Sequence, residues 1–175
     1  MTAIVFHQGK LMGDRKHTIL TNPTTFVDGS KIFISDDKSF AYGVAGRSIT
    51  PEQQVQYENI IRTLLEYMIV HGDDRKNIKE IVPKMDENID FTTGILVTRC
   101  RQYIIQDIGK GIIRRLDGAS HGTGTGGNIV VSMLRCGMLP HAAFDRIGKL
   151  DHLTGSVFDT IEAKRLRPFV IKGGN

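Results

Sequence analysis

The sequence predicts an α+β fold in which antiparallel sheets are covered by separated pairs of helices. Short apolar segments bounded by turn residues fill the first 46 positions, a pattern typical of paired strands. From Pro51 the apolar residues recur at helical spacing, and a second block of strands followed by helices begins near residue 93. Strands and helices in separate blocks favour antiparallel sheets with helices packed against them.

Two predicted hairpins precede the first helix. A Gln8-Gly9 turn joins the first strand pair and brings Asp14 back beside the start of the chain. Residues 17–30 are predicted to form a loop, because they are polar and contain Asn22-Pro23 and Asp28-Gly29. The strands predicted in this part lie at residues 3–6, 11–12, 31–34 and 40–46.

The most regular helical pattern begins at Pro51. Apolar residues recur at three- and four-residue steps from Val55 to Ile69, behind a Thr50-Pro51-Glu52 start that suits an N-cap and first turn. Further helices are predicted at 76–85, 128–135 and 141–150, and further strands at 93–98, 103–107, 111–116 and 169–171. No repeat or linker interrupts this order, so residues 1–175 are predicted to form a single domain.

Composition excludes several classes of protein. The net charge of +4 comes from Lys and Arg scattered among acidic residues, so nucleic-acid binding is not favoured. Cys100 and Cys136 form no CxxC pair, and the six histidines show no zinc-ligand spacing with them. No signal peptide and no apolar segment of about 18 residues is present. We therefore expect a cytoplasmic protein without a metal or a membrane contact.

Thr2 is the first candidate catalytic residue. If Met1 is removed, Thr2 carries a hydroxyl nucleophile together with a free α-amine, whose pKa of about 7.7–8.0 suits a general base. Lys31 begins an apolar strand, where a carboxylate such as Asp14 would keep it charged. Gly46 ends the following strand, and its N–H can point into a cleft. Taken singly, Lys31 also fits a solvated strand end and Gly46 an ordinary turn.

Two later segments carry further candidates. The glycine-rich run His121–Asn128 places the hydroxyl of Thr125 among backbone donors at a helix start. The run also matches the G-x-G-x-x-G pattern of dinucleotide loops, and Asp145 lies near the acidic position of that pattern. Only about fifty residues follow the run, however, too few for a dinucleotide fold. Asp151 and Thr154, just past a predicted helix, suit either an amine-orienting role or an ordinary helix end.

Taken in order, these motifs resemble the β-type subunits of the proteasome, within the N-terminal-nucleophile (Ntn) hydrolases, and especially the bacterial ATP-dependent peptidase that forms two-ring particles. The resemblance covers almost the whole chain, although the first hairpin is shorter here. The matching segments are Thr2-Ala3-Ile4-Val5, Gly13-Asp14, Ser30-Lys31-Ile32, Gly43-Val44-Ala45-Gly46, Gly124-Thr125-Gly126-Gly127 and Asp151–Ser156. In the last two, threonine replaces the family's serine and the hydroxyl is retained.

The resemblance implies a four-layer αββα sandwich and a set of residue roles. Thr2 would attack the scissile carbonyl, Lys31 held by Asp14 would tune the nucleophile, and the Gly46 N–H would bind the oxyanion. Three residues would orient the amine: Thr125, Asp151 and Thr154. Thr18 would bind the substrate backbone, and an apolar first specificity pocket would be formed by His17, Gly29 and Val44.

The leading hypothesis is therefore a threonine endopeptidase that needs no cofactor or metal. By the same resemblance it would act on peptides or unfolded proteins inside a homo-oligomeric ring, with an AAA+ unfoldase as a possible partner. Two alternatives stay open. One is a catalytically inactive proteasome-like binding or scaffold protein, and the other is an Ntn amidohydrolase that cleaves small amides.

Overall fold

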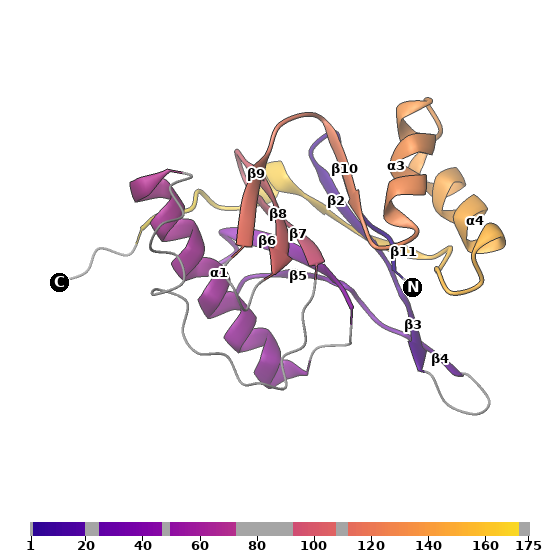
Figure 1. Ribbon diagram of the computed structural model, residues 1–175, viewed down its shortest axis with the longest axis horizontal. Coiled ribbons are helices and arrows are strands. Elements are labelled where there is room, and N and C mark those ends of the chain that lie inside the picture. Colours follow the sequence, from indigo (N-terminus) through magenta and orange to yellow (C-terminus); the bar gives the residue numbers. More distant parts are fainter. Residues whose placement is uncertain (1, 20–24, 47–49, 73–92, 108–111, 172–175) are drawn as a thin grey trace.

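The computed structural model describes residues 2–19, 25–46, 50–72, 93–107 and 112–171 (Figure 1). Within these ranges the chain forms two main antiparallel sheets, a two-stranded ribbon and helices on the outer faces of the sheets. The predicted α+β class is confirmed.

The first sheet carries the start of the chain. It has the strand order β10-β1-β2-β11. The strands are β1 (Ile4–His7), β2 (Lys10–Asp14), β10 (Ser120–Thr123) and β11 (Phe158–Glu162). The turn between β1 and β2 uses positive φ angles at Gln8 and Gly9, as a tight hairpin requires. Pairing of Ile4 with Gly13 then places Asp14 opposite Ala3.

The second sheet is a meander of consecutive strands, β5-β6-β7-β8-β9. Its strands are β5 (Ile32–Ile34), β6 (Phe40–Ala45), β7 (Thr93–Thr98), β8 (Gln102–Asp107) and β9 (Ile112–Leu116). Where β5 crosses β2, a Cβ atom on Gly13 would lie only 2.7 Å from Ile32 Cγ2. The missing side chain therefore allows the close approach that brings neighbouring Lys31 toward Asp14.

Three described α-helices cover the sheets. They are α1 (Pro51–His71), α3 (Gly127–Arg135) and α4 (Pro140–Leu150). The predicted N-cap of α1 is confirmed, because Thr50 and Gln53 exchange hydrogen bonds in a capping box. The helix predicted at 76–85 lies outside the described residues.

Buried apolar residues form three clusters, one at each interface between layers. The first joins α1 to the second sheet, with Tyr57 and Leu64 against Tyr42 and Leu96. The second lies between the sheets, and the third joins α3 and α4 to the first sheet. In Figure 1, α1 lies on one side of the sheets and α3 and α4 on the other, as the four-layer arrangement requires.

Two sequence predictions about strands are wrong, and two strands were missed. Residues 17–30 contain a ribbon of β3 (Lys16–Ile19) and β4 (Thr25–Asp28) rather than a continuous loop. Its described β4 residues are all exposed, so no buried apolar alternation signals it. Residues 169–171 form no strand; the ring of Phe169 packs against Phe40 of the first apolar cluster. Strands β10 and β11 were not predicted.

Candidate active site

The Asp14 carboxylate is the centre of the candidate site. Asp14 ends β2 and is fully buried. Its Oδ1 accepts a hydrogen bond from Ala3 N at 2.7 Å, and its Oδ2 accepts one from Lys31 Nζ at 2.8 Å. The backbone N–H groups of Gly155 and Lys16 also donate to Oδ2, at 3.0 and 3.3 Å. One carboxylate therefore joins the chain start, the lysine and the segment after α4.

Lys31 is almost completely buried, with 5% of its side chain exposed. Burial lowers the pKa of the Lys31 ammonium, and the ion pair with Asp14 opposes that shift only in part. The Lys31 carbonyl accepts a hydrogen bond from Val44 N, which fixes the start of β5 against β6. The predicted pairing of Lys31 with Asp14 is thus present.

The backbone of Thr2 is held by the glycine turn, residues 124–126. Gly126 N donates to the Thr2 carbonyl at 3.2 Å. Gly124 has a φ of +77°, and a Cβ atom there would lie 2.1 Å from Thr2 O. Only glycine permits this approach in this backbone conformation. Thr2 itself is 8% exposed, and the turn fixes it at one edge of the site.

Asp151 and Thr154 lie together after α4. The Thr154 hydroxyl donates to Asp151 Oδ2 at 2.6 Å, and Leu153 N donates to Oδ1 at 3.0 Å. Burial by itself would raise the pKa of Asp151, but these two hydrogen bonds, together with nearby positive charge that includes His152, hold the pKa below its ordinary value. A Cβ atom on Gly126 would meet both Thr154 Oγ1 and Ala3 Cβ, so Thr154 lies beside the glycine turn that holds Thr2.

Gly46 and Thr125 are both exposed. Gly46 follows β6 directly, with a φ of +144°. At this end of the sandwich Thr93, which is paired with Ala45, accepts a hydrogen bond from Thr123 at 2.9 Å. Because Thr123 pairs with Ile4, the end of β6 and the start of β1 lie at the same end of the fold.

The four predicted substrate-binding residues divide into two groups. On the ribbon, a His17 ring nitrogen lies 3.1 Å from the Gly29 carbonyl. Thr18 Oγ1 is buried and has no hydrogen-bond partner among the described residues. Val44 belongs instead to the apolar cluster beneath α1. It contacts the site through the hydrogen bond that its N–H donates to the Lys31 carbonyl.

Sequence reasoning did not single out Ala3, Gly126 and Gly155 as site residues. All three act through backbone N–H groups, which bind Asp14 or the Thr2 carbonyl. A signal was available for the two glycines, because both belong to the glycine-containing motifs that follow β10 and α4. No side-chain chemistry marks Ala3.

The described part of the chain contains neither a cluster of metal-ligating side chains nor a membrane-spanning helix. Its His, Cys, Asp and Glu side chains form no group of three or more that could hold a metal ion. Its helices include none with the length and apolar character needed to cross a membrane.

Comparison with solved structures shows that the chain has the fold of the proteasome-like Ntn hydrolases. HslV from Trypanosoma brucei aligns with a TM-score of 0.60 and 14% identity, over 91% of this chain and 97% of that one. BPH from Thiobacillus denitrificans aligns with a TM-score of 0.58 and 8% identity, over 92% and 96%.

A mutant of Anbu from Hyphomicrobium sp. strain MC1 aligns with a TM-score of 0.56 and 12% identity, over 91% of this chain and 80% of that one. No protein-family profile matches the sequence, and no curated protein sequence matches it. At these identities the likeness defines the fold, and the chemistry must be argued from the residues of the site.

Proposed function

We propose that the protein is a threonine-type endopeptidase whose nucleophile is the Thr2 hydroxyl, with the Thr2 α-amine as general base after removal of Met1. The Asp14 carboxylate is the observation that carries this proposal. It hydrogen-bonds the amide that follows Thr2 with one oxygen and buried Lys31 with the other. The Asp14 carboxylate thereby connects the buried Lys31 ammonium to the backbone next to the proposed nucleophile.

The proposed reaction has two stages. Thr2 Oγ attacks the scissile carbonyl carbon, and its proton passes to the α-amine, whose ordinary pKa of about 7.7–8.0 leaves part of it neutral near pH 7. The Gly46 N–H stabilises the oxyanion. The α-ammonium then protonates the leaving nitrogen. Water hydrolyses the ester on Thr2 and restores the hydroxyl.

Lys31 acts on this reaction electrostatically. Its ammonium favours the developing alkoxide of Thr2, and this effect is strong because the group is buried. Asp14 keeps the ammonium charged and in position, since the lysine would otherwise lose its proton more readily. Asp151, Thr154 and Thr125 orient the α-amine in this proposal, supported by the contact of Thr154 with the glycine turn.

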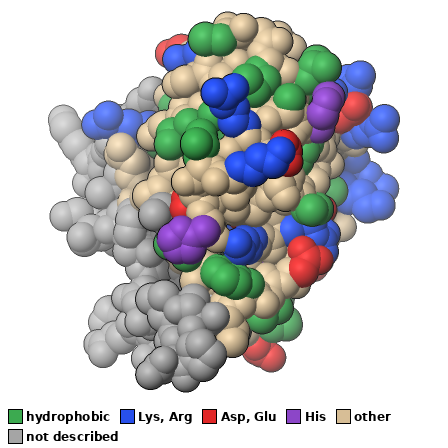
Figure 2. Space-filling view, turned by 90° about the vertical axis from the view of Figure 1, so that its right-hand side faces the viewer, with side chains coloured by type: hydrophobic (Ala, Val, Ile, Leu, Met, Phe, Trp, Pro, Cys, Tyr) green, Lys and Arg blue, Asp and Glu red, His purple; other side chains and the backbone are tan. Residues whose placement is uncertain are grey.

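The proposed substrate is a peptide or an unfolded protein, bound along Thr18 and in a pocket formed by His17, Gly29 and Val44. The proposed working form is a cytoplasmic homo-oligomeric ring served by an AAA+ unfoldase. Exposed apolar side chains on α3, α4 and the turn between them support subunit contacts: Ile129, Leu139 and Leu150. Figure 2 shows hydrophobic side chains in separate patches among charged ones on the face that includes these helices.

Hydrolysis of fluorogenic peptides by protein of verified N-terminus tests the proposal. Intact mass shows whether Met1 is absent, and the Thr2→Ala variant serves as the control. We expect turnover by the Met1-free protein and none by Thr2→Ala. No turnover by assembled, Met1-free protein would favour the scaffold alternative. Turnover of small amides alone, by a species that light scattering shows to be monomeric, would favour the amidohydrolase.

A further inference from the structure

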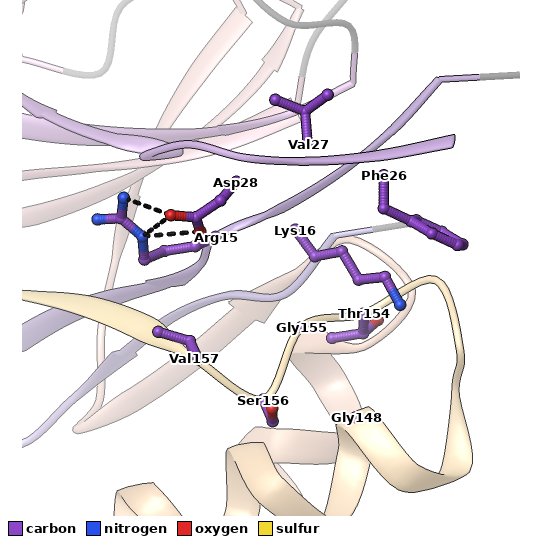
Figure 3. A pocket seen from close by; sticks show the side chains of 10 residues that line it. All are labelled: Arg15, Lys16, Phe26, Val27, Asp28, Gly148, Thr154, Gly155, Ser156 and Val157. Carbon is purple, nitrogen blue, oxygen red and sulfur yellow. Dashed lines mark hydrogen bonds and ion pairs between the residues drawn. The ribbon is translucent and has the colours of Figure 1, made fainter. Parts of the chain in front are cut away.

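A cavity of about 360 Å³ lies beside the candidate active site. It is bounded by the β3–β4 ribbon on one side and by α4 and the segment after it on the other (Figure 3). Thr154 and Gly155 line it, and the same two residues contact Asp151 and Asp14 in the site. The cavity therefore shares two wall residues with the candidate active site.

Charges in the cavity wall are unevenly neutralised. Arg15 makes hydrogen-bonded ion pairs with both Asp28 and Asp159, each at 2.9 Å. Lys16 forms no ion pair among the described residues; its ammonium donates to the His152 carbonyl and lies 4.0 Å from the centre of the Phe26 ring. Lysine has three N–H donors, so two can still serve a ligand. Figure 3 shows Lys16 reaching from the ribbon toward Thr154.

The rest of the wall suits a short aliphatic stem. Phe26 and Val157 offer exposed apolar surface. Gly155 adds no side chain there, and a Cβ atom on it would lie 2.9 Å from Lys16 Cβ. A ligand group with a few methylenes and an anionic end can therefore contact the apolar wall and reach the lysine ammonium.

We propose that this cavity is a side-chain subsite of the peptidase and that Lys16 gives it a preference for glutamate near the scissile bond. The inference rests on the proposed function. The two methylenes of glutamate contact Phe26 and Val157, and its carboxylate accepts a charge-assisted hydrogen bond from Lys16. Glutamine has the same length and shape without the charge. A comparison of glutamate and glutamine substrates therefore measures the contribution of the Lys16 charge.

The test measures kcat/KM for peptides that carry either glutamate or glutamine at each of the positions flanking the cleaved bond. We expect a glutamate-to-glutamine ratio of about three to ten at one position for the wild-type protein. Lys16→Met brings the ratio near one, whereas Lys16→Arg keeps it above one. Lys149→Met is the matched control, because Lys149 is an exposed lysine of α4 paired with Asp145, and it leaves the ratio unchanged.

A ratio compares two substrates on the same enzyme sample, so partial unfolding of a variant does not alter it. A wild-type ratio near one at every position, or a ratio that survives Lys16→Met, overturns the subsite while peptide hydrolysis stands. If the Met1-free protein hydrolyses no peptide, the proposed function and the subsite fall together.

Discussion

Replacement of Asp14 by asparagine perturbs the site most directly. The change keeps the size of the side chain but removes its negative charge. Lys31 then has a buried ammonium that has lost its carboxylate partner, and the new amide NH₂ group cannot accept the hydrogen bonds that Oδ2 now receives. Two unfavourable effects therefore add in a fully buried position.

The expected magnitude follows from the burial of both partners. Asp14 is 0% exposed and Lys31 5% exposed, and breaking a buried ion pair on one side destabilises a protein by about 3–5 kcal/mol. We expect Asp14→Asn to lower the free energy of unfolding by about this amount. Peptide hydrolysis should also be lost, because the lysine becomes neutral more readily without its partner.

Urea unfolding followed by circular dichroism measures the effect. Asp28→Asn is the matched control, because Asp28 is also in an ion pair, with Arg15, but is largely exposed. The unfolding midpoint of this variant should stay close to the wild-type value. Adding Lys31→Met to Asp14→Asn should recover part of the stability, since the buried ammonium is then removed together with the carboxylate. A loss below about 1 kcal/mol in Asp14→Asn would show that the Asp14–Lys31 ion pair does not stabilise the fold as proposed.

Two further predictions test the backbone and acid parts of the site. Gly124→Ala should lower the free energy of unfolding by at least about 2 kcal/mol more than Gly137→Ala does. Both glycines have positive φ, but only Gly124 lies against Thr2. Equal losses in urea unfolding would contradict this. Asp151 has a depressed pKa in the folded state, so it contributes stability above its ordinary pKa of about 3.9 that is lost as the pH falls through the lower folded-state value. Wild type should therefore lose more stability between pH 5 and pH 2 than Asp151→Asn; identical losses would show that Asp151 makes no such contribution.

The sequence was sufficient where a residue's chemistry depends on near neighbours along the chain. A short hairpin with a Gln8-Gly9 turn necessarily returns Asp14 to the chain start, and the structure places it there. The pairing of Lys31 with Asp14 could be predicted too, because a lysine at the start of an apolar strand needs a carboxylate.

The sequence was insufficient where tertiary packing decides the outcome. Strand β10 contains Ser120, His121 and Gly122, which have weak strand preference. It forms because Gly122 permits close contact with α3, where a Cβ atom would lie 2.4 Å from Gly127 O. Likewise, the stacking of Phe158 in β11 on Phe144 of α4 joins segments whose proximity no local pattern reveals.

In the proposed mechanism a free α-amine on Thr2 activates the hydroxyl of the same residue. The most direct measurement uses a chain with a cleavable tag fused ahead of Thr2 in place of Met1, assayed for peptide hydrolysis before and after the tag is removed. We expect no turnover while the amine is blocked, and turnover that increases in step with the release of Thr2, as followed by intact mass. Equal hydrolysis by the tagged and untagged chains would contradict it.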